Sequence, residues 1–114
     1  MSKYVFVYGT LKQGYGNHRL LSKEPMLRGA VTLPCRMISL GGFPALVPSD
    51  DYHEIHGEIY EVDDSTFESL DFLEGYPDFY NRDTFYWNLM DVEVWYYYIP
   101  EGYADAEPVA NNCW

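Results

Sequence analysis

The first residues of the chain form a short run of apolar and aromatic side chains. Residues 3–8 read KYVFVY, so an extended segment here would carry apolar side chains on both faces. This pattern is typical of a central strand covered on both sides, and Gly9 and Thr10 then end it. Farther on, Asn17 is a suitable N-cap for a short helix over residues 18–22.

The middle of the chain predicts extended structure with short interruptions. Residues 28–51 indicate two short strands around Gly41–Gly42, followed by a turn at Pro48–Asp51. Residues 56–62 read HGEIYEV and predict another strand of about six residues. Gly57 within it would permit a bulge or a close approach of another backbone.

The clearest helix is predicted to follow that strand. Asp64 or Ser65 would cap its start, and Ser65 with Glu68 matches the spacing of a capping box. Gly75 is placed where a helix ends in a left-handed residue, and Pro77 prevents continuation. The helix is therefore expected to end at Gly75.

Two more strands are predicted in the second half of the chain. Residues 80–90 and 91–100 are rich in aromatic and β-branched side chains, and residues 88–91 would join them. The last dozen residues, which include Pro108, indicate an irregular tail. About six short strands with one good helix favour an α+β domain built on a strongly curved sheet or a small barrel.

The length, aromatic content and net charge of the chain exclude some classes of protein. The 114 residues fit a single domain over 1–114, and the 18% share of aromatic residues argues against a disordered chain. There are 18 acidic and 7 basic residues, which gives a net charge of −11. Such a negative surface repels phosphate groups, so we expect neither a nucleic-acid partner nor an anionic membrane partner.

The cysteines and the apolar runs exclude further classes. Cys35 and Cys113 are too few and too separated for a disulfide framework or a zinc site. The neighbours of Cys35 offer no base, so we expect it to pack rather than to act as a nucleophile. No run approaches the roughly 20 apolar residues of a membrane span, and the N-terminus lacks a signal-peptide pattern. We therefore expect a cytoplasmic protein.

One acidic residue lies at an unusual position on the predicted helix. Phe67, Leu70 and Leu73 form its apolar stripe. Glu74 lies four residues after Leu70 and seven after Phe67, which places it on that stripe rather than opposite it. Burial and the negative end of the helix dipole would both raise the pKa of Glu74. A carboxyl group with a raised pKa in a pocket is suited to general acid–base catalysis.

Other interpretations of these segments stay open. Glu74 is also explained as a surface acid at the helix end, while Glu68 and Asp71 are expected to be ordinary solvated acids. The glycine-rich segment that starts at Gly9 is a plain turn or an anion-binding nest of backbone N–H groups.

Four segments together resemble the gamma-glutamylcyclotransferase-like family, which includes the gamma-glutamylamine cyclotransferases. They are VYGTLKQGYGNHRLL at 7–21, GGFPALV at 41–47, GEIYEV at 57–62 and LDFLEGYPDFYNR at 70–82. The resemblance implies a small mixed β-barrel of about five to seven strands, with short helices packed around it. It also implies an enzyme that closes the γ-glutamyl group to 5-oxoproline and releases an amine or an amino acid.

The resemblance also implies roles for individual residues. Glu74 matches the family's catalytic acid–base residue. The substrate-binding residues would be Tyr8, Gly9, Thr10, Leu11, Gly42, Tyr80 and Tyr97. The turn at Gly9 would hold either the α-carboxylate of the substrate or the developing oxyanion. No cofactor is implied, the partner is a small γ-glutamyl compound, and we expect a monomer or a weak homodimer.

The sequence leaves the roles of two aromatic positions open. Tyr80 either lines the pocket or belongs to the core, with Arg82 paired to one of the many acids. In the run Tyr96–Tyr98 the family pattern favours Tyr97, but the sequence does not fix which tyrosine faces the pocket.

Other functional classes receive less support. His53 and His56 point to opposite sides of a strand, so they are not expected to share a metal ion. The main alternative to an enzyme is a binding or interaction module on the same fold. A third possibility is a cyclotransferase that acts on a γ-glutamyl group carried by a larger molecule.

Overall fold

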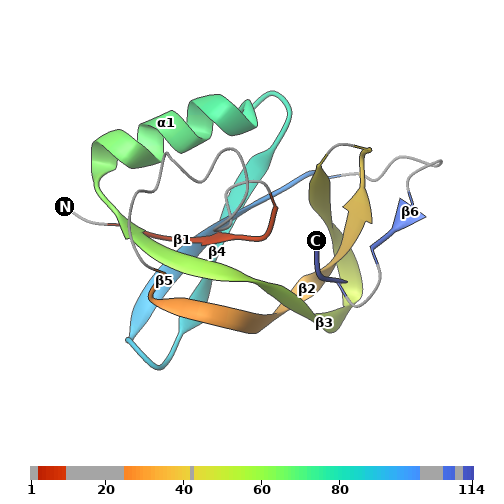
Figure 1. Cartoon of the computed structure of the whole chain (residues 1–114), viewed down its shortest axis with the longest axis horizontal. Coiled ribbons are helices and arrows are strands. Elements are labelled where there is room, and N and C mark those ends of the chain that lie inside the picture. The colour runs from red at the N-terminus through yellow and green to blue at the C-terminus, as the bar shows by residue number, and fades with distance from the viewer. Residues whose placement is uncertain (1–2, 10–24, 42, 101–106, 110–111) are drawn as a thin grey trace.

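The computed structural model describes residues 3–9, 25–41, 43–100, 107–109 and 112–114. In these segments, six strands form one mixed sheet and one helix lies across it (Figure 1). The elements are β1 (Lys3–Val7), β2 (Leu27–Ser39), β3 (Pro44–Val62), α1 (Asp64–Glu74), β4 (Asn81–Trp87), β5 (Val92–Tyr98) and β6 (Glu107–Pro108).

The first strand occupies the middle of the sheet, as its apolar run predicts. The strand order is β4-β5-β1-β3-β2-β6, with β1 parallel to β5 and antiparallel to β3. Val5, Phe6 and Val7 are all buried. Val5 and Val7 face the cluster that contains the helix, whereas Phe6 faces the opposite side. The prediction of a strand covered on both faces is therefore confirmed.

The two longest strands differ from the prediction. β3 runs without interruption from Pro44 to Val62, so the predicted turn at Pro48–Asp51 is wrong. This segment is extended because β2 pairs with it, and Cys35 lies opposite Pro48. The register shifts between Leu33 and Cys35, which accommodates the missing N–H of the intervening proline.

Gly57 marks the place where β3 passes closest to β1. A Cβ atom on Gly57 would lie 2.3 Å from the carbonyl oxygen of Val7 and 2.7 Å from Cζ of Phe6. No side chain fits there, so the prediction of a close backbone approach is confirmed.

The α+β class is correct, but the predicted barrel is not. β4 and β6 are the two edges of the sheet and are not paired with each other, so the sheet remains open. β3 curls enough for Leu46 to accept a 2.9 Å backbone hydrogen bond from Ile99, just beyond β5. That bond draws the ends of the curved sheet together without forming the ladder that closure requires.

The helix ends as predicted but begins one residue earlier. Asp63 is the N-cap, and its Oδ1 accepts a 2.7 Å hydrogen bond from the backbone N–H of Thr66. The predicted caps Asp64 and Ser65 are therefore wrong, and Asp64 instead forms a 2.9 Å ion pair with Lys3. At the other end Gly75 is left-handed, with a φ of 68°, which glycine adopts without steric cost.

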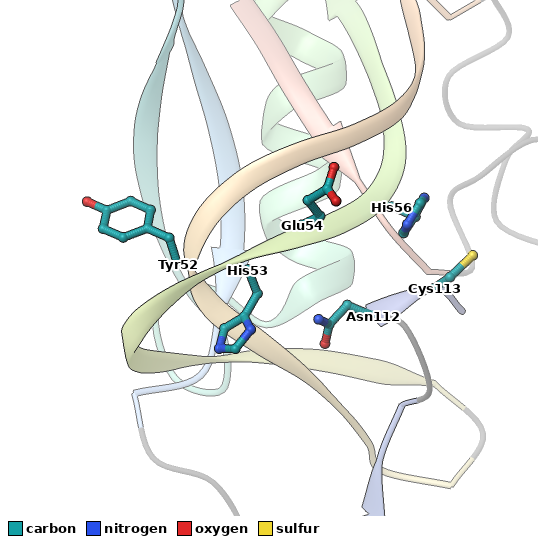
Figure 2. A pocket seen from close by; sticks show the side chains of 6 residues that line it. All are labelled: Tyr52, His53, Glu54, His56, Asn112 and Cys113. Atoms are coloured by element: carbon teal, nitrogen blue, oxygen red, sulfur yellow. The ribbon is translucent and has the colours of Figure 1, made fainter.

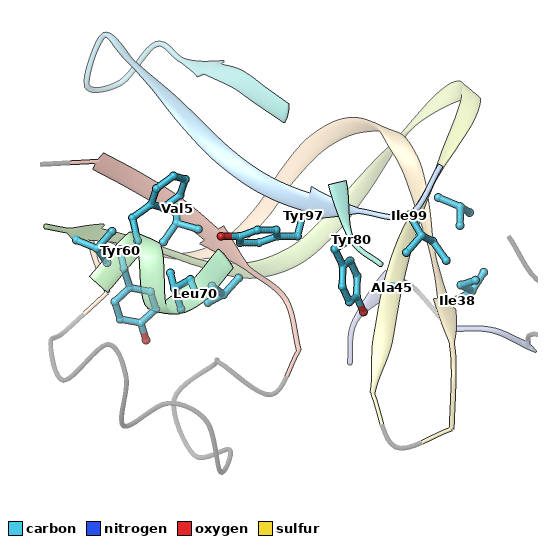
Figure 3. Packing of buried hydrophobic residues seen from close by; sticks show 12 residues of the cluster. Val5, Ile38, Ala45, Tyr60, Leu70, Tyr80, Tyr97 and Ile99 are labelled. Atoms are coloured by element: carbon cyan, nitrogen blue, oxygen red, sulfur yellow. The ribbon is translucent and has the colours of Figure 1, made fainter. Parts of the chain in front are cut away.

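The core has one apolar cluster on each side of the sheet. The cluster under α1 contains Val5, Tyr60, Phe67, Leu70 and Tyr97, among others (Figure 3). The prediction that Leu73 belongs to the apolar stripe is wrong, because 41% of its surface is exposed. After Leu70, the partly buried positions of the helix are the acidic residues Asp71 and Glu74.

Three remaining expectations concern the chain ends and the last hairpin. β4 and β5 are joined by residues 88–91, as predicted. The irregular tail is contradicted at β6, which pairs with β2. The predicted helix over residues 18–22 lies outside the described residues. No helix in the described segments is long and apolar enough to cross a membrane.

Candidate active site

Glu74 is the last residue of α1 and is partly buried. Burial raises the pKa of its carboxyl group from 4.5 to about 7. Its spacing from Phe67 and Leu70 predicted a position on the buried side of the helix, and the partial burial of Glu74 agrees with that. A carboxyl group with a pKa near neutrality gains and releases protons easily at physiological pH.

Tyr8 follows β1 immediately, and its phenol interacts electrostatically with the carboxyl group of Glu74. Its hydroxyl donates a 2.6 Å hydrogen bond to the carbonyl oxygen of Tyr97 and accepts one of 3.3 Å from the N–H of Leu46. Burial raises the pKa of Tyr8 well above its usual value, and interactions with Tyr80 and Glu74 raise it further. The phenol is therefore neutral at physiological pH.

Tyr97 is the member of the tyrosine run that faces α1. Its hydroxyl donates a 2.6 Å hydrogen bond to Oδ1 of Asp71. Burial raises the pKa of Tyr97, and the hydrogen bond and charge of Asp71 and the charge of Glu74 add to this effect. Tyr96 and Tyr98 belong to the cluster on the other side of the sheet.

Tyr80 is buried in the cluster under α1, and Figure 3 shows its ring beside Tyr97 and Ala45. Its hydroxyl donates a 2.8 Å hydrogen bond to the carbonyl oxygen of Pro44. Tyr80 therefore belongs to the core, and its interaction with Tyr8 also places it next to the candidate site.

Asp71 is a residue of the candidate site that was not predicted from the sequence. It was expected to be solvated, but it accepts the hydroxyl of Tyr97 on Oδ1 and pairs with Arg82 through Oδ2. The signal was present in the sequence. Asp71 lies four residues after Phe67 and three before Glu74, which places it beside both on one face of the helix.

The turn after β1 is described only in part. A Cβ atom on Gly9 would lie 2.8 Å from Cγ and 2.9 Å from Cδ of Pro44, so this position is closely packed. Thr10, Leu11 and Gly42, the other predicted residues of the substrate-binding loops, lie outside the described residues.

Two other candidate groups lie away from Glu74. Cys35 is buried, and burial raises the pKa of its thiol to about 11, which agrees with a packing residue. His53 and His56, which were expected on opposite sides of a strand, both line a separate pocket with Tyr52, Glu54, Asn112 and Cys113 (Figure 2). No three His, Cys, Asp or Glu side chains of the described segments are arranged to hold a metal ion.

The most similar proteins all point to one family. Residues 5–114 match the family model described as "Gamma-glutamyl cyclotransferase, AIG2-like". A Methanocaldococcus jannaschii protein with a provisional gamma-glutamylcyclotransferase name is 36% identical over 103 residues, which cover 87% of this chain and 86% of the relative. The gamma-glutamylaminecyclotransferase of Rattus norvegicus is 33% identical over 90 residues, which cover 69% of this chain and 59% of the relative.

A solved structure supports the same grouping. The solution structure of the protein YtfP from Escherichia coli superimposes with a TM-score of 0.71 at 26% identity, covering 97% of this chain and 95% of that chain. The family match spans nearly the whole chain, and the fold agrees with it. The chain therefore belongs to the AIG2-like gamma-glutamyl cyclotransferase family.

Proposed function

We propose that the chain is a cyclotransferase that converts a γ-glutamyl compound into 5-oxoproline and a free amine or amino acid. The observation that carries the proposal is the carboxyl group of Glu74, which is partly buried and has a pKa raised by burial to about 7. The neutral phenols of Tyr8 and Tyr97 interact electrostatically with this carboxyl group. The family assignment and the names of the relatives support the same reaction class.

Glu74 acts first as a base and then as an acid. The α-ammonium group of the substrate transfers a proton to the Glu74 carboxylate, which frees the lone pair of the nitrogen. The nitrogen attacks the γ-carbonyl carbon, so that one C–N bond forms and a tetrahedral oxyanion develops. Protonated Glu74 then gives its proton to the leaving nitrogen, and the original amide bond breaks as the oxyanion re-forms the carbonyl group. The ring nitrogen gives its second proton to the released amine, so the products are 5-oxoproline and an ammonium ion.

The remaining task of the protein is to fold the substrate so that its two ends meet. Holding the α-nitrogen against the γ-carbonyl is catalysis by proximity. In this proposal, Gly9, Thr10 and Leu11 bind the α-carboxylate or the oxyanion through backbone N–H groups, and Gly42 is a further substrate-binding residue. Tyr8, Tyr80 and Tyr97 form the wall beside Glu74.

The proposed substrates are small γ-glutamyl amines and related γ-glutamyl compounds. The Rattus norvegicus relative is named for γ-glutamylamines. A Niallia circulans relative, 33% identical over 73 residues, is named as a gamma-L-glutamyl-butirosin B gamma-glutamyl cyclotransferase. These names support a shared γ-glutamyl group with a variable leaving amine.

The test is a direct assay of 5-oxoproline release from a panel of γ-glutamyl amines and γ-glutamyl amino acids. Glu74→Gln should lose at least about a thousandfold in kcat, because glutamine keeps the shape but cannot carry the proton. Glu68→Gln on the exposed side of the same helix is the matched control and should keep parent activity. A parent protein that releases no 5-oxoproline from any member of the panel contradicts the proposed function. An active Glu74→Gln variant contradicts the role of Glu74.

A further inference from the structure

Asp71 forms a fixed bridge between α1 and the two strands β4 and β5. Its Oδ1 accepts a 2.6 Å hydrogen bond from the hydroxyl of Tyr97, and its Oδ2 pairs with Nη1 of Arg82. The exposed fractions of the Asp71 and Arg82 side chains are only 21% and 22%. Both carboxylate oxygens are therefore occupied in a poorly solvated environment.

Aromatic rings hold Arg82 in place. Its guanidinium carbon lies 4.1 Å from the ring centre of Tyr76, 4.8 Å from that of Phe67 and 5.0 Å from that of Trp95. A planar guanidinium group packed among rings and paired with a carboxylate has few alternative positions. Arg82 therefore fixes Asp71, and Asp71 in turn fixes the hydroxyl of Tyr97.

This bridge determines whether the hydroxyl of Tyr97 can donate or accept a hydrogen bond with a ligand. A phenol has one hydrogen to donate, and the hydrogen of Tyr97 points to Asp71. The same oxygen keeps lone pairs that accept hydrogen bonds. Asp71 and Glu74 lie three residues apart on α1, so the Tyr97 oxygen bonded to Asp71 is an acceptor on the same face of the helix as the proposed base.

The substrate in the proposed reaction brings matching donors. An α-ammonium group carries three N–H bonds, and only one of these protons passes to Glu74 before attack. A second N–H needs an acceptor that fixes the direction of the nitrogen lone pair. A serine-like hydroxyl, free to rotate, would donate as readily as it accepts, but a phenol tied to a carboxylate accepts only.

We infer that Asp71 is a positioning residue: it holds the hydroxyl hydrogen of Tyr97, and the Tyr97 oxygen thereby accepts an N–H of the substrate's α-amino group beside Glu74. The inference rests on the proposed function. During the reaction one proton moves from the substrate nitrogen to Glu74, while the hydrogen of Tyr97 stays on the Tyr97–Asp71 bond throughout. Asp71 touches no substrate atom.

A purely structural role of Asp71 is the alternative, since its bridge also anchors the end of α1. A double-mutant cycle on kcat/KM separates the two. Asp71→Asn keeps the shape, but its amide group can donate to Tyr97 and turn the hydroxyl hydrogen toward the substrate. We expect Asp71→Asn to lower kcat/KM about 10- to 100-fold, the range for loss of a charge-assisted hydrogen bond. In a Tyr97→Phe background the same change should cost less than about threefold.

A pair of competitive ligands adds a measurement that stability does not affect. The first is a slowly reacting γ-glutamyl amide with its α-amino group, and the second is its analogue without that group. Asp71→Asn and Tyr97→Phe should weaken inhibition by the first ligand about tenfold or more and leave the second almost unchanged. Tyr97→Phe retains the buried ring, so this comparison still decides the matter if Asp71→Asn does not fold.

Two results would overturn the inference while leaving the proposed function intact. One is equal loss of kcat/KM from Asp71→Asn with and without the Tyr97 hydroxyl. The other is equal weakening of both ligands. If the parent protein shows no release of 5-oxoproline at all, the proposed function fails first and this inference fails with it.

Discussion

The hydroxyl of Tyr8 donates a 2.6 Å hydrogen bond to the backbone carbonyl oxygen of Tyr97. The two residues lie on neighbouring segments, because β1 and β5 are parallel partners in the sheet. The same hydroxyl accepts from the N–H of Leu46 in β3. One side chain thus joins three segments, and its phenol interacts electrostatically with Glu74.

Tyr8→Phe should therefore lower both stability and activity. The change leaves a buried N–H at Leu46 and a buried C=O at Tyr97 without this partner, which costs about 1–3 kcal/mol. Urea titration measures the free energy of unfolding, and the 5-oxoproline assay measures activity. Tyr52→Phe is the control, because Tyr52 is 68% exposed and should change the unfolding free energy by less than about 0.5 kcal/mol. Equal midpoints for both variants would contradict the structural role of Tyr8.

The pH dependence of activity should report the ionisation of Glu74. Burial raises its pKa to about 7, and the proposed base must be ionised to take the proton. The value of kcat/KM should fall about tenfold per pH unit well below that point. Glu68→Gln should keep this profile. A flat profile down to about pH 5 would mean that an ordinary carboxyl group, or another residue, is the base.

The packing around Gly9 changes the expectation for this position. The sequence left this segment as a plain turn or an anion-binding nest, and in a nest a side chain at Gly9 would harm substrate binding. In the structure, however, even a methyl group would press on Pro44, whose carbonyl oxygen accepts the hydroxyl of Tyr80. Gly9→Ala should therefore destabilise the fold by about 1–3 kcal/mol and also disturb the site.

Gly29→Ala provides the matched control for this prediction. No heavy atom lies within 4 Å of a Cβ placed on Gly29, so the added methyl group meets open space. Thermal denaturation of the two variants, alongside the activity assay, makes the comparison. If the two variants have the same melting temperature and only Gly9→Ala loses activity, the turn serves ligand binding rather than packing.

The sequence predicted the local features better than the long-range ones. The end of α1 followed from Gly75 alone, because a left-handed glycine acts within one helical turn. Its start was predicted at Asp64 or Ser65, but Asp63 is the N-cap, because a side chain of the same type one residue earlier suits that position equally well. The apparent turn at Pro48–Asp51 became strand because pairing with β2 outweighs local preference. Closure of a barrel depends on how the edge strands meet, which a periodic pattern does not encode.

In the candidate site, too, local spacing could be predicted from the sequence, whereas contacts between distant segments could not. Helical spacing placed Glu74 toward the sheet, and the spacing of Asp71 carried the same information. The expectation that Asp71 is solvated is wrong, because its two partners on β4 and β5, which lie 11 and 26 residues away, become its neighbours only in the folded sheet. The side of the sheet that Tyr97 faces became evident only from the register of β5, in which Tyr97 lies opposite Arg82.

The last prediction concerns the effect of Glu74 on stability. The pKa of Glu74 is raised by burial from 4.5 to about 7, so the fold favours its protonated form. This contribution to stability is fully present below about pH 4.5 and is lost as the pH rises through about 7. Glu74→Gln, which is neutral at every pH, should therefore match the parent in acid and exceed its stability above pH 7. The difference should reach about 1–3 kcal/mol, at roughly 1.4 kcal/mol per unit of pKa shift less the effect of partial solvation.

Paired urea titrations of parent and variant between about pH 4 and pH 8 measure this difference, with Glu68→Gln as the exposed control. The control should follow the parent at every pH, because an exposed acid keeps its unfolded-state behaviour. A Glu74→Gln variant that is less stable than the parent at pH 8, with the difference shrinking in acid, would mean that folding lowers the pKa of Glu74 rather than raising it. Glu74 would then be held ionised by a partner in the folded protein, and a structural ion pair would replace the proton carrier at the end of α1.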